Sequence, residues 1–336
     1  MNASTDTQGP HRGRGRKRRG EELMVPRAEF RSYYGRPVIK APSWSARDIA
    51  GYFFLGGLAG AGSALAAGAH LTGRTTTATA LKLSSTGAIG LSVAALVHDL
   101  GRPERFTHML RVFKPTSPMS VGSWLLGLYG PAAGLAAVTA ASGRFPRTGA
   151  ATTAAAALTG SAVATYTAVL AADTAVPAWH DAHRELPYLF AASATAAASG
   201  MALVLGPVRE TGPARCAAVL AAAGDLAASA AAERRLGLVA ETWRGGRAGT
   251  LLRTARILTV AGAVGALVSA RPGRAARPLA ALGGCALLAG SACTRFGVFA
   301  AGIASAEDPR YTVLPQRERL DAEAVARERE GHDTAR

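Results

Sequence analysis

Eight apolar stretches, each long enough to cross a bilayer as a helix, occupy the chain between residues 49 and 306. A helix of about 20 apolar residues spans the hydrocarbon core of a membrane. Because lipid offers no hydrogen-bond partners, the backbone at that depth must satisfy its own groups, as a helix does. We therefore expect an all-α integral membrane protein, an eight-transmembrane-helix bundle arranged as two four-helix halves. The expected helices cover residues 49–71, 78–98, 121–141, 149–172, 188–206, 214–232, 254–270 and 278–306.

The two ends of the chain differ from its middle in charge. We expect a basic, partly disordered N-terminal tail at 1–48, a membrane domain at 49–306 and a charged C-terminal tail at 307–336. Gly, Arg and polar residues dominate the tail through about residue 25, a composition typical of disorder. No apolar segment follows the early Arg-rich run directly, so we expect no cleavable signal peptide.

Charge predicts the orientation of the expected helices. Of the 38 Lys and Arg residues, 28 fall on the side of the N-terminus and 8 on the opposite side, while Lys82 and Arg295 lie within spans. The positive-inside rule then places both termini in the cytoplasm and the protein in the cell (cytoplasmic) membrane. The net charge of +16 is explained by this topology and by anionic membrane lipid. We expect no nucleic-acid partner.

The chain offers no expected metal, haem or cluster site of its own. No C-x-x-C spacing occurs, so no iron–sulfur or zinc site is expected. His70 and His98 end neighbouring helices on opposite sides of the membrane, too far apart for a bis-histidine haem. His180 and His183 have H-x-x-H spacing but lie in a polar loop without an evident third ligand. The cysteines, expected to be small buried side chains, are Cys216, Cys285 and Cys293.

Two ionisable residues fall deep within expected helices. Asp225 lies near the middle of 214–232, and Arg295 lies within 278–306. An ionisable group at membrane depth is costly and is by default a functional candidate. Two interpretations stay open: a buried ion pair that fixes helix register, or a proton path. Lys82 is close enough to the opposite surface to extend its ammonium to it, and we assign it no function.

Polar and aromatic groups gather where three expected helices reach the N-terminal side. A quinone site needs an apolar slot for the ring and tail, and donors that bind the carbonyls and pass protons. Tyr166 lies within a helix, where its hydroxyl requires a partner. Trp44 and Trp179 are also ordinary interfacial anchors. The candidates for this site are Tyr52, His98, Asp99, Arg102, Tyr166 and Asp173.

Several runs of sequence together resemble the NrfD family, the membrane subunits of polysulfide-reductase-type complexes. They are YGRP at 34–37, YFFLGGLAG at 52–60, HDLGRPERF at 98–106 and KPTSPMSVGSW at 114–124. Tyr166 and the PAW run at 177–179 continue the similarity. These runs cover most of residues 33–190, whereas the last four helices share only length and hydropathy with the family.

The resemblance implies a haem-free, quinone-binding subunit that anchors a redox complex to the membrane. Its partners would be an iron–sulfur electron-transfer subunit and a molybdopterin oxidoreductase subunit, for which a formate-dehydrogenase-like enzyme is one candidate. The cofactor would be a quinone, menaquinone or ubiquinone, with no haem or iron–sulfur cluster in this chain. Tyr166 matches the family's quinone-contacting tyrosine. Where some members carry Asn and His, this chain has Ile49 and Tyr52, so Tyr52 is the candidate replacement donor.

The resemblance and the residues together give the expected roles. Electron exchange between the iron–sulfur partner and membrane quinone would make this chain a subunit of an oxidoreductase complex, not catalytic alone. Its quinone-binding residues would be Tyr166, Tyr52, His98 and Asp99. Proton relay or partner docking would fall to Arg102, Asp173, Asp225 and Arg295.

Two other functions remain open on the sequence. The first is a proton or small-solute transporter with an Asp225/Arg295 relay, although no repeat relates residues 49–172 to 188–306, as many transporters would show. The second is a structural membrane anchor whose quinone site has decayed. Loss of Tyr166 should abolish quinone turnover if the chain is the redox subunit and should change nothing if it is the decayed anchor.

Overall fold

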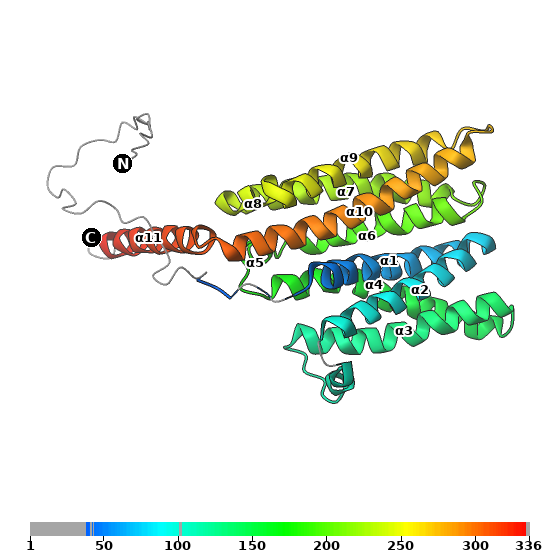
Figure 1. Ribbon diagram of the computed structural model, residues 1–336, viewed down its shortest axis with the longest axis horizontal. Helices are drawn as coiled ribbons and strands as arrows, with labels where there is room; N and C mark the ends of the chain where they lie inside the picture. The colour runs from blue at the N-terminus through cyan, green and yellow to red at the C-terminus, as the bar shows by residue number, and fades with distance from the viewer. Residues whose placement is uncertain (1–37, 41, 43, 101–102, 334–336) are drawn as a thin grey trace, which may run out of the picture.

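The computed structural model describes residues 38–40, 42, 44–100 and 103–333 (Figure 1). Over those residues it consists of helices joined by turns and irregular segments, with no β-strand. The expected disorder of the N-terminal tail and the position of Arg102 lie outside the described residues. Eight described helices are long and apolar enough to cross a membrane, which confirms the expected multi-pass membrane protein.

The eight long helices run side by side, and short helical segments connect them on one face. The membrane-length helices are α1 (Gly51–Leu71, continued from the π-helical turn η1, Ala46–Ala50), α2 (Thr75–Asp99), α3 (Pro118–Ser142), α4 (Pro146–Ala172), α6 (Leu186–Leu205), α7 (Gly212–Arg235), α9 (Gly246–Val268) and α10 (Ala276–Glu307). The shorter elements are η2 (Pro103–Leu110), α5 (Pro177–His180), η3 (Gly237–Ala240) and α8 (Glu241–Arg244), and the C-terminal helix is α11 (Arg310–Asp333).

The helices extend past the apolar stretches that predicted them. α9 begins at Gly246, where the sequence predicted 254, because the turns carrying Arg247 and Arg253 continue the helix into polar surroundings. The charged C-terminal tail is also largely helical, as α11. Hydropathy marks the part of a helix that lipid can cover, whereas hydrogen bonding continues beyond it.

α1 lies at the centre of the bundle. It packs against α2, α4 and α6 and also reaches α10, while α9 and α10 form another extensive contact (Figure 1). The expected division into two four-helix halves stays a prediction, because α1 joins both groups of helices. Connections η2, α5 and η3–α8, together with the start of α1 and the end of α10, lie on one face, from which α11 projects.

Backbone contact between glycines sets how closely the helices approach. A Cβ on Gly60 of α1 would collide with the Gly160 carbonyl of α4, and one on Gly200 of α6 would collide with the Gly284 carbonyl of α10. Close packing of small residues replaces the hydrophobic driving force that is missing between helices in lipid. These two contacts hold the central helices in fixed register, and α1 and α4 carry two of the candidate tyrosines.

Candidate functional site

A cavity of about 100 Å³ lies between α1, α2, α3 and α4, near the face that carries the α5 and η2 connections. Most of its lining is apolar, and the polar exceptions are two tyrosines, one aspartate and one serine. Its lining residues are Trp44, Ile49, Tyr52, Leu96, Asp99, Leu100, Met109, Met119, Gly122, Ser123, Leu126, Tyr166 and Leu170. We call it the Tyr52–Tyr166 cavity.

The structure brings three of the sequence-predicted residues to this cavity. Tyr52 comes from the first turn of α1, Asp99 from the end of α2 and Tyr166 from α4. Within the described part of the chain, neither tyrosine hydroxyl has a hydrogen-bond partner. Asp99 accepts the backbone N–H of Ser45 at 3.0 Å, which ties the entry to α1 onto the end of α2. The cavity thus holds two hydroxyls whose hydrogen bonds remain to be made.

Gly122 of α3 makes room for the Tyr166 ring. A Cβ at position 122 would overlap the Tyr166 hydroxyl and the ring carbons beside it. The next residue, Ser123, donates its hydroxyl to the Met119 carbonyl at 2.9 Å and approaches the Met109 sulfur at 3.7 Å. On the α3 side of the cavity, Gly122 therefore packs against the Tyr166 ring. The hydroxyl of Ser123 is already hydrogen-bonded within α3.

Trp44 closes the cavity from the segment before α1. Its ring stacks on Trp179 of α5, with centroids 5.7 Å apart and planes 17° apart. Trp179 is fully buried, donates its indole N–H to the Val298 carbonyl at 2.8 Å and fills the space left by Gly302 of α10. The wall of a cavity among the first four helices is thus fixed by α10.

Three other predicted site residues lie elsewhere. The His98 side chain is 79% exposed, and its Nδ1 lies 3.1 Å from Asp48 Oδ2 on the outside of the bundle. Asp173 caps the end of α4 and is exposed. Arg102 lies outside the described residues. Adjacent positions at the end of a helix point in different directions, so Asp99 reaches the cavity while His98 does not.

Asp225 and Arg295 are both buried, at 2% and 0% exposure, as their depth in the sequence predicted. Among the described residues, however, no ion pair joins them within 4.0 Å. Arg295 instead donates to the Phe190 carbonyl at 2.6 Å, and its guanidinium carbon lies 3.7 Å from the centre of the Phe190 ring. A Cβ at Gly57 would lie 3.0 Å from the guanidinium, so α1 also packs closely on it.

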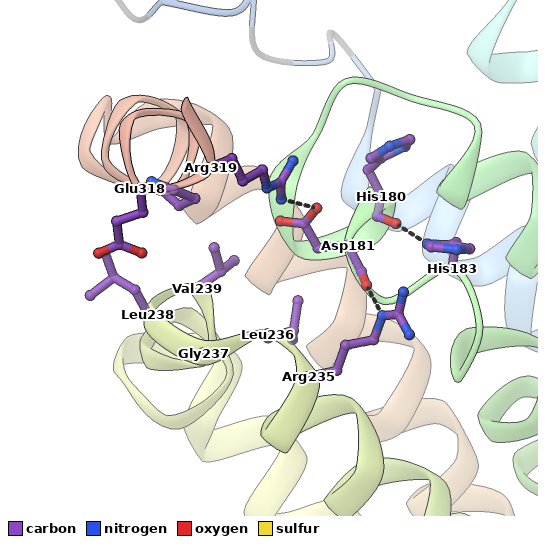
Figure 2. A pocket seen from close by; sticks show the side chains of 11 residues that line it. His180, Asp181, His183, Arg235, Leu236, Gly237, Leu238, Val239, Glu318 and Arg319 are labelled. Carbon is purple, nitrogen blue, oxygen red and sulfur yellow. Dashed lines mark hydrogen bonds and ion pairs between the residues drawn. The ribbon is translucent and has the colours of Figure 1, made fainter. Parts of the chain in front are cut away.

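A second, polar pocket of about 620 Å³ opens on the face that carries the connections (Figure 2). Arg319 of α11 reaches across it to the Asp181 carboxylate at 3.0 Å, and Arg235 donates to the Asp181 carbonyl at 2.9 Å. His180 and His183 are exposed, and each Nδ1 lies within hydrogen-bond distance of a backbone carbonyl. In the described part of the chain no group of three potential metal ligands occurs.

Sequence reasoning missed Gly122, Ser123, Met109 and Met119, although three of them lie within or beside the quoted runs. Depth and polarity identified Tyr52 and Tyr166, but nothing local to Gly122 reports that a ring from another helix fills its place.

Comparison with protein families supports the resemblance seen in the sequence. The family model described as polysulphide reductase, NrfD matches residues 40–212, which is more than half of the chain and includes every wall of the Tyr52–Tyr166 cavity. A search of curated proteins found no match. The match ends at the start of α7, so the last three membrane helices lie outside it. The chain belongs to the NrfD family of polysulphide-reductase-type membrane subunits.

Proposed function

We propose that this protein is the membrane-anchoring, quinone-binding subunit of an oxidoreductase complex, exchanging electrons between an iron–sulfur partner subunit and membrane quinone. The observation that carries the proposal is the Tyr52–Tyr166 cavity, in which two hydroxyls without a hydrogen-bond partner among the described residues face an apolar enclosure. Ligand sites of this kind combine apolar walls with a few polar groups that fix orientation. The NrfD membership supports the same class of ligand.

The residues fit a quinone headgroup. Ring faces suit the apolar walls formed by Trp44, Leu126 and Leu170, and ring carbonyls suit hydroxyl donors. Tyr52 and Tyr166 each supply one O–H donor, so each can bind a carbonyl oxygen without giving up an existing hydrogen bond. Bound there, the quinone supplies the two-electron chemistry that this chain lacks, and the remaining steps belong to the residues around it.

Proton movement is assigned to Asp99 in this proposal. Reduction of a quinone adds one proton at each carbonyl oxygen together with two electrons, which the iron–sulfur partner supplies, and quinol oxidation releases both. Asp99 lines the cavity and lies at the end of α2, so it stands between the tyrosines and the aqueous face. A carboxylate in this place can hand protons inward or accept them, as general acid–base groups do.

The face that carries the connections is proposed to dock the redox partner. It holds the polar pocket of Figure 2, with His180, Asp181, Arg235 and Arg319 around it. The Tyr52–Tyr166 cavity lies near the same face, which shortens the distance from a docked cluster to a bound quinone. Asp173 and Arg102 are proposed to contribute to that docking. The catalytic partner is proposed to be a molybdopterin oxidoreductase, formate-dehydrogenase-like in type.

The docking face is proposed to be cytoplasmic, with the chain in the cytoplasmic membrane. By the sequence assignment, Lys and Arg residues are enriched on this side, which also carries the start of η1 and the C-terminal helix α11. An alkaline phosphatase fusion after residue 336 tests this orientation. We expect no phosphatase activity from this fusion and full fluorescence from a green fluorescent protein fusion at the same place. Periplasmic phosphatase activity would contradict the orientation while leaving the quinone site unaffected.

The transporter interpretation receives less support. Its relay requires Asp225 and Arg295 to exchange a proton, but Arg295 is held by the Phe190 carbonyl and ring and closely packed by α1. Neither residue lines the Tyr52–Tyr166 cavity. A structural role, in which Arg295 ties α10 to α6, accounts for these contacts. The decayed-anchor interpretation is opposed by the two tyrosines that still face an open cavity.

The test is Tyr166→Phe in the complete complex. We expect quinone turnover to fall by about 10²-fold, because the headgroup loses the hydrogen bond that holds it in place, and misplacement of a reactant can cost that much. Electron transfer from the substrate to a water-soluble dye should remain unchanged, because it bypasses the membrane subunit. Tyr129→Phe is the matched control: Tyr129 is buried in α3 and bonded to Ser63 at 2.8 Å, away from the cavity. Wild-type quinone turnover in Tyr166→Phe would overturn the proposal.

A further inference from the structure

A third pocket, of about 280 Å³, lies on the face opposite the docking face, between the ends of α1 and α3 and the beginnings of α2 and α4. Its polar lining consists of three threonines and three basic side chains. The lining residues are His70, Thr75, Ala78, Thr79, Lys82, Thr139, Ala140, Gly143, Arg144, Pro146 and Gly149. We call it the Lys82 pocket.

Lys82 is the unusual member of this pocket. The residue is only 6% exposed, yet within the described part of the chain its ammonium forms no hydrogen bond or ion pair. Lys82 lies two turns into α2, about 10 Å along the axis from the helix start. Side chains on a helix lean toward its N-terminus, so the ammonium extends toward the pocket mouth at Thr75 and Thr79. A buried cation without a partner calls for an anion.

The remaining charges of the pocket are also positive. Arg144 lines the mouth, and none of the described lining residues is acidic. Glu210, which accepts the Thr77 N–H at 2.8 Å, is not part of the lining. The amino end of α4 and the carboxyl end of α3 both reach the pocket, so their opposed dipoles largely cancel. The charges of Lys82 and Arg144 therefore make the electrostatic potential of the pocket positive.

The surroundings of the pocket belong to the membrane interface. Leu71 and Phe145 flank it in sequence, beside His70 and Arg144, and both are largely exposed. Phe145 also holds a left-handed backbone, with φ of 57°, at the turn between α3 and α4. Exposed apolar side chains beside basic ones at a helix end are typical of the boundary between headgroups and acyl chains.

We propose that the Lys82 pocket binds the phosphate of an anionic phospholipid headgroup in the leaflet opposite the docking face. Lys82 contacts the phosphate from inside the bundle, and Arg144 contacts it from the mouth. Thr75 and Thr79 lie on the same face of α2 as Lys82, at spacings of seven and three residues, and supply hydroxyl donors. The exposed Leu71 and Phe145 meet the acyl chains, which a free phosphate lacks. This site is independent of quinone exchange.

The experiment is native mass spectrometry of the full chain in mild detergent, titrated with phosphatidylglycerol. The variants are Lys82→Met and Arg144→Met, with Arg274→Met as control, since Arg274 is an exposed basic residue of the α9–α10 connection on the same face. Because Lys82→Met removes a charge-assisted hydrogen bond to the phosphate, it should weaken lipid retention by at least about tenfold. Arg144→Met should weaken it less, and Arg274→Met should match the wild type.

The competing outcomes separate the sources of phosphate. Retention of phosphatidylglycerol by Lys82→Met at the wild-type level would overturn the proposal. Inorganic phosphate at millimolar concentration that displaces the lipid would show a soluble-anion site and would overturn the lipid assignment. Because Arg144 is exposed, its variant reports on the pocket even if Lys82→Met fails to fold, and unchanged retention by Arg144→Met in that case would also contradict the proposal.

Discussion

The Tyr52–Tyr166 cavity and the Asp225–Arg295 region are both polar places within a membrane bundle, yet they are built in different ways. In the cavity, two hydroxyls face open space, and apolar side chains surround them. In the other region, the guanidinium of Arg295 lies on the Phe190 ring and donates to its carbonyl. One place offers hydroxyl donors to an open cavity, while the other holds a guanidinium closed in by the Phe190 ring and by α1, with its Nε and Nη1 unpartnered among the described residues.

The contrast shows that depth alone does not define a site. Sequence position identified Asp225 and Arg295 as costly buried charges, and both are indeed buried. Space beside a polar group is a separate property, and in this protein it depends on Gly122 opposite Tyr166. A buried charge that packs closely can fix helix register, whereas a less costly hydroxyl beside a cavity can bind and turn over a substrate.

Gly122→Ala should have an effect as large as that of Tyr166→Phe, because it removes the space beside the Tyr166 hydroxyl directly. The added methyl group overlaps the Tyr166 hydroxyl, so the ring must move. Displacement of a positioning group by about 1 Å can cost about 10²-fold in rate, and we expect a loss of that order in quinone turnover. Gly134→Ala on the same helix, where a Cβ meets nothing within 4 Å, is the matched control. Equal quinone turnover by Gly122→Ala and Gly134→Ala would show that the space beside Tyr166 is not what distinguishes the cavity from the Asp225–Arg295 region.

Asp99→Asn should have a smaller effect on the same reaction. The amide oxygen can still accept the Ser45 N–H, so the entry to α1 should keep its place. We expect quinone turnover to fall by about tenfold, below the usual range for acid–base groups because water near the face can carry protons. His98→Gln tests the neighbouring residue, which points away from the cavity, and steady-state turnover should stay near the wild-type value. The reverse order of the two variants would reassign the proton group to His98.

Substitution of Arg295 should affect stability while sparing quinone turnover. Arg295→Ala leaves a cavity in the core, and large-to-small changes of this kind cost about 2–5 kcal/mol. Arg295→Met keeps most of the volume and removes a buried charge, so we expect a change below about 1.5 kcal/mol. Thermal unfolding in detergent measures both. Loss of turnover in a well-folded Arg295→Met variant would give this region a functional role.

The smallest effect concerns Glu210, which links the α6–α7 connection to the start of α2. The Thr77 backbone N–H donates to its carboxylate and holds the pKa of Glu210 below its usual value. Its stabilising contribution is complete above the ordinary glutamate pKa of about 4.3 and is lost as pH falls through the lower, folded value. Melting temperatures below about pH 5 should therefore decline more for the wild type than for Glu210→Gln. Parallel curves would show that this contact contributes nothing.

Much of the fold follows from the sequence, since apolar length alone located all eight membrane helices. Their ends did not follow, because helices such as α9 continue past the lipid-compatible stretch. Within the candidate site, Tyr52, Asp99 and Tyr166 were predictable as polar groups near one face. Gly122 was not, because its role is a contact between α3 and α4. Lys82 shows the same limit. Its position predicted extension toward the surface, but not that the side chain would be largely buried without a partner among the described residues.

Photolabelling with an azidoquinone tests the central claim most directly. The complete complex is illuminated with the probe and digested, and the labelled residues are mapped by mass spectrometry. We expect labels on the walls of the Tyr52–Tyr166 cavity, above all at Met109, Met119 and Tyr166, and their loss when excess unlabelled quinone competes. Competable labels on α7 and α10 around Asp225 and Arg295, with none on those walls, would contradict the account.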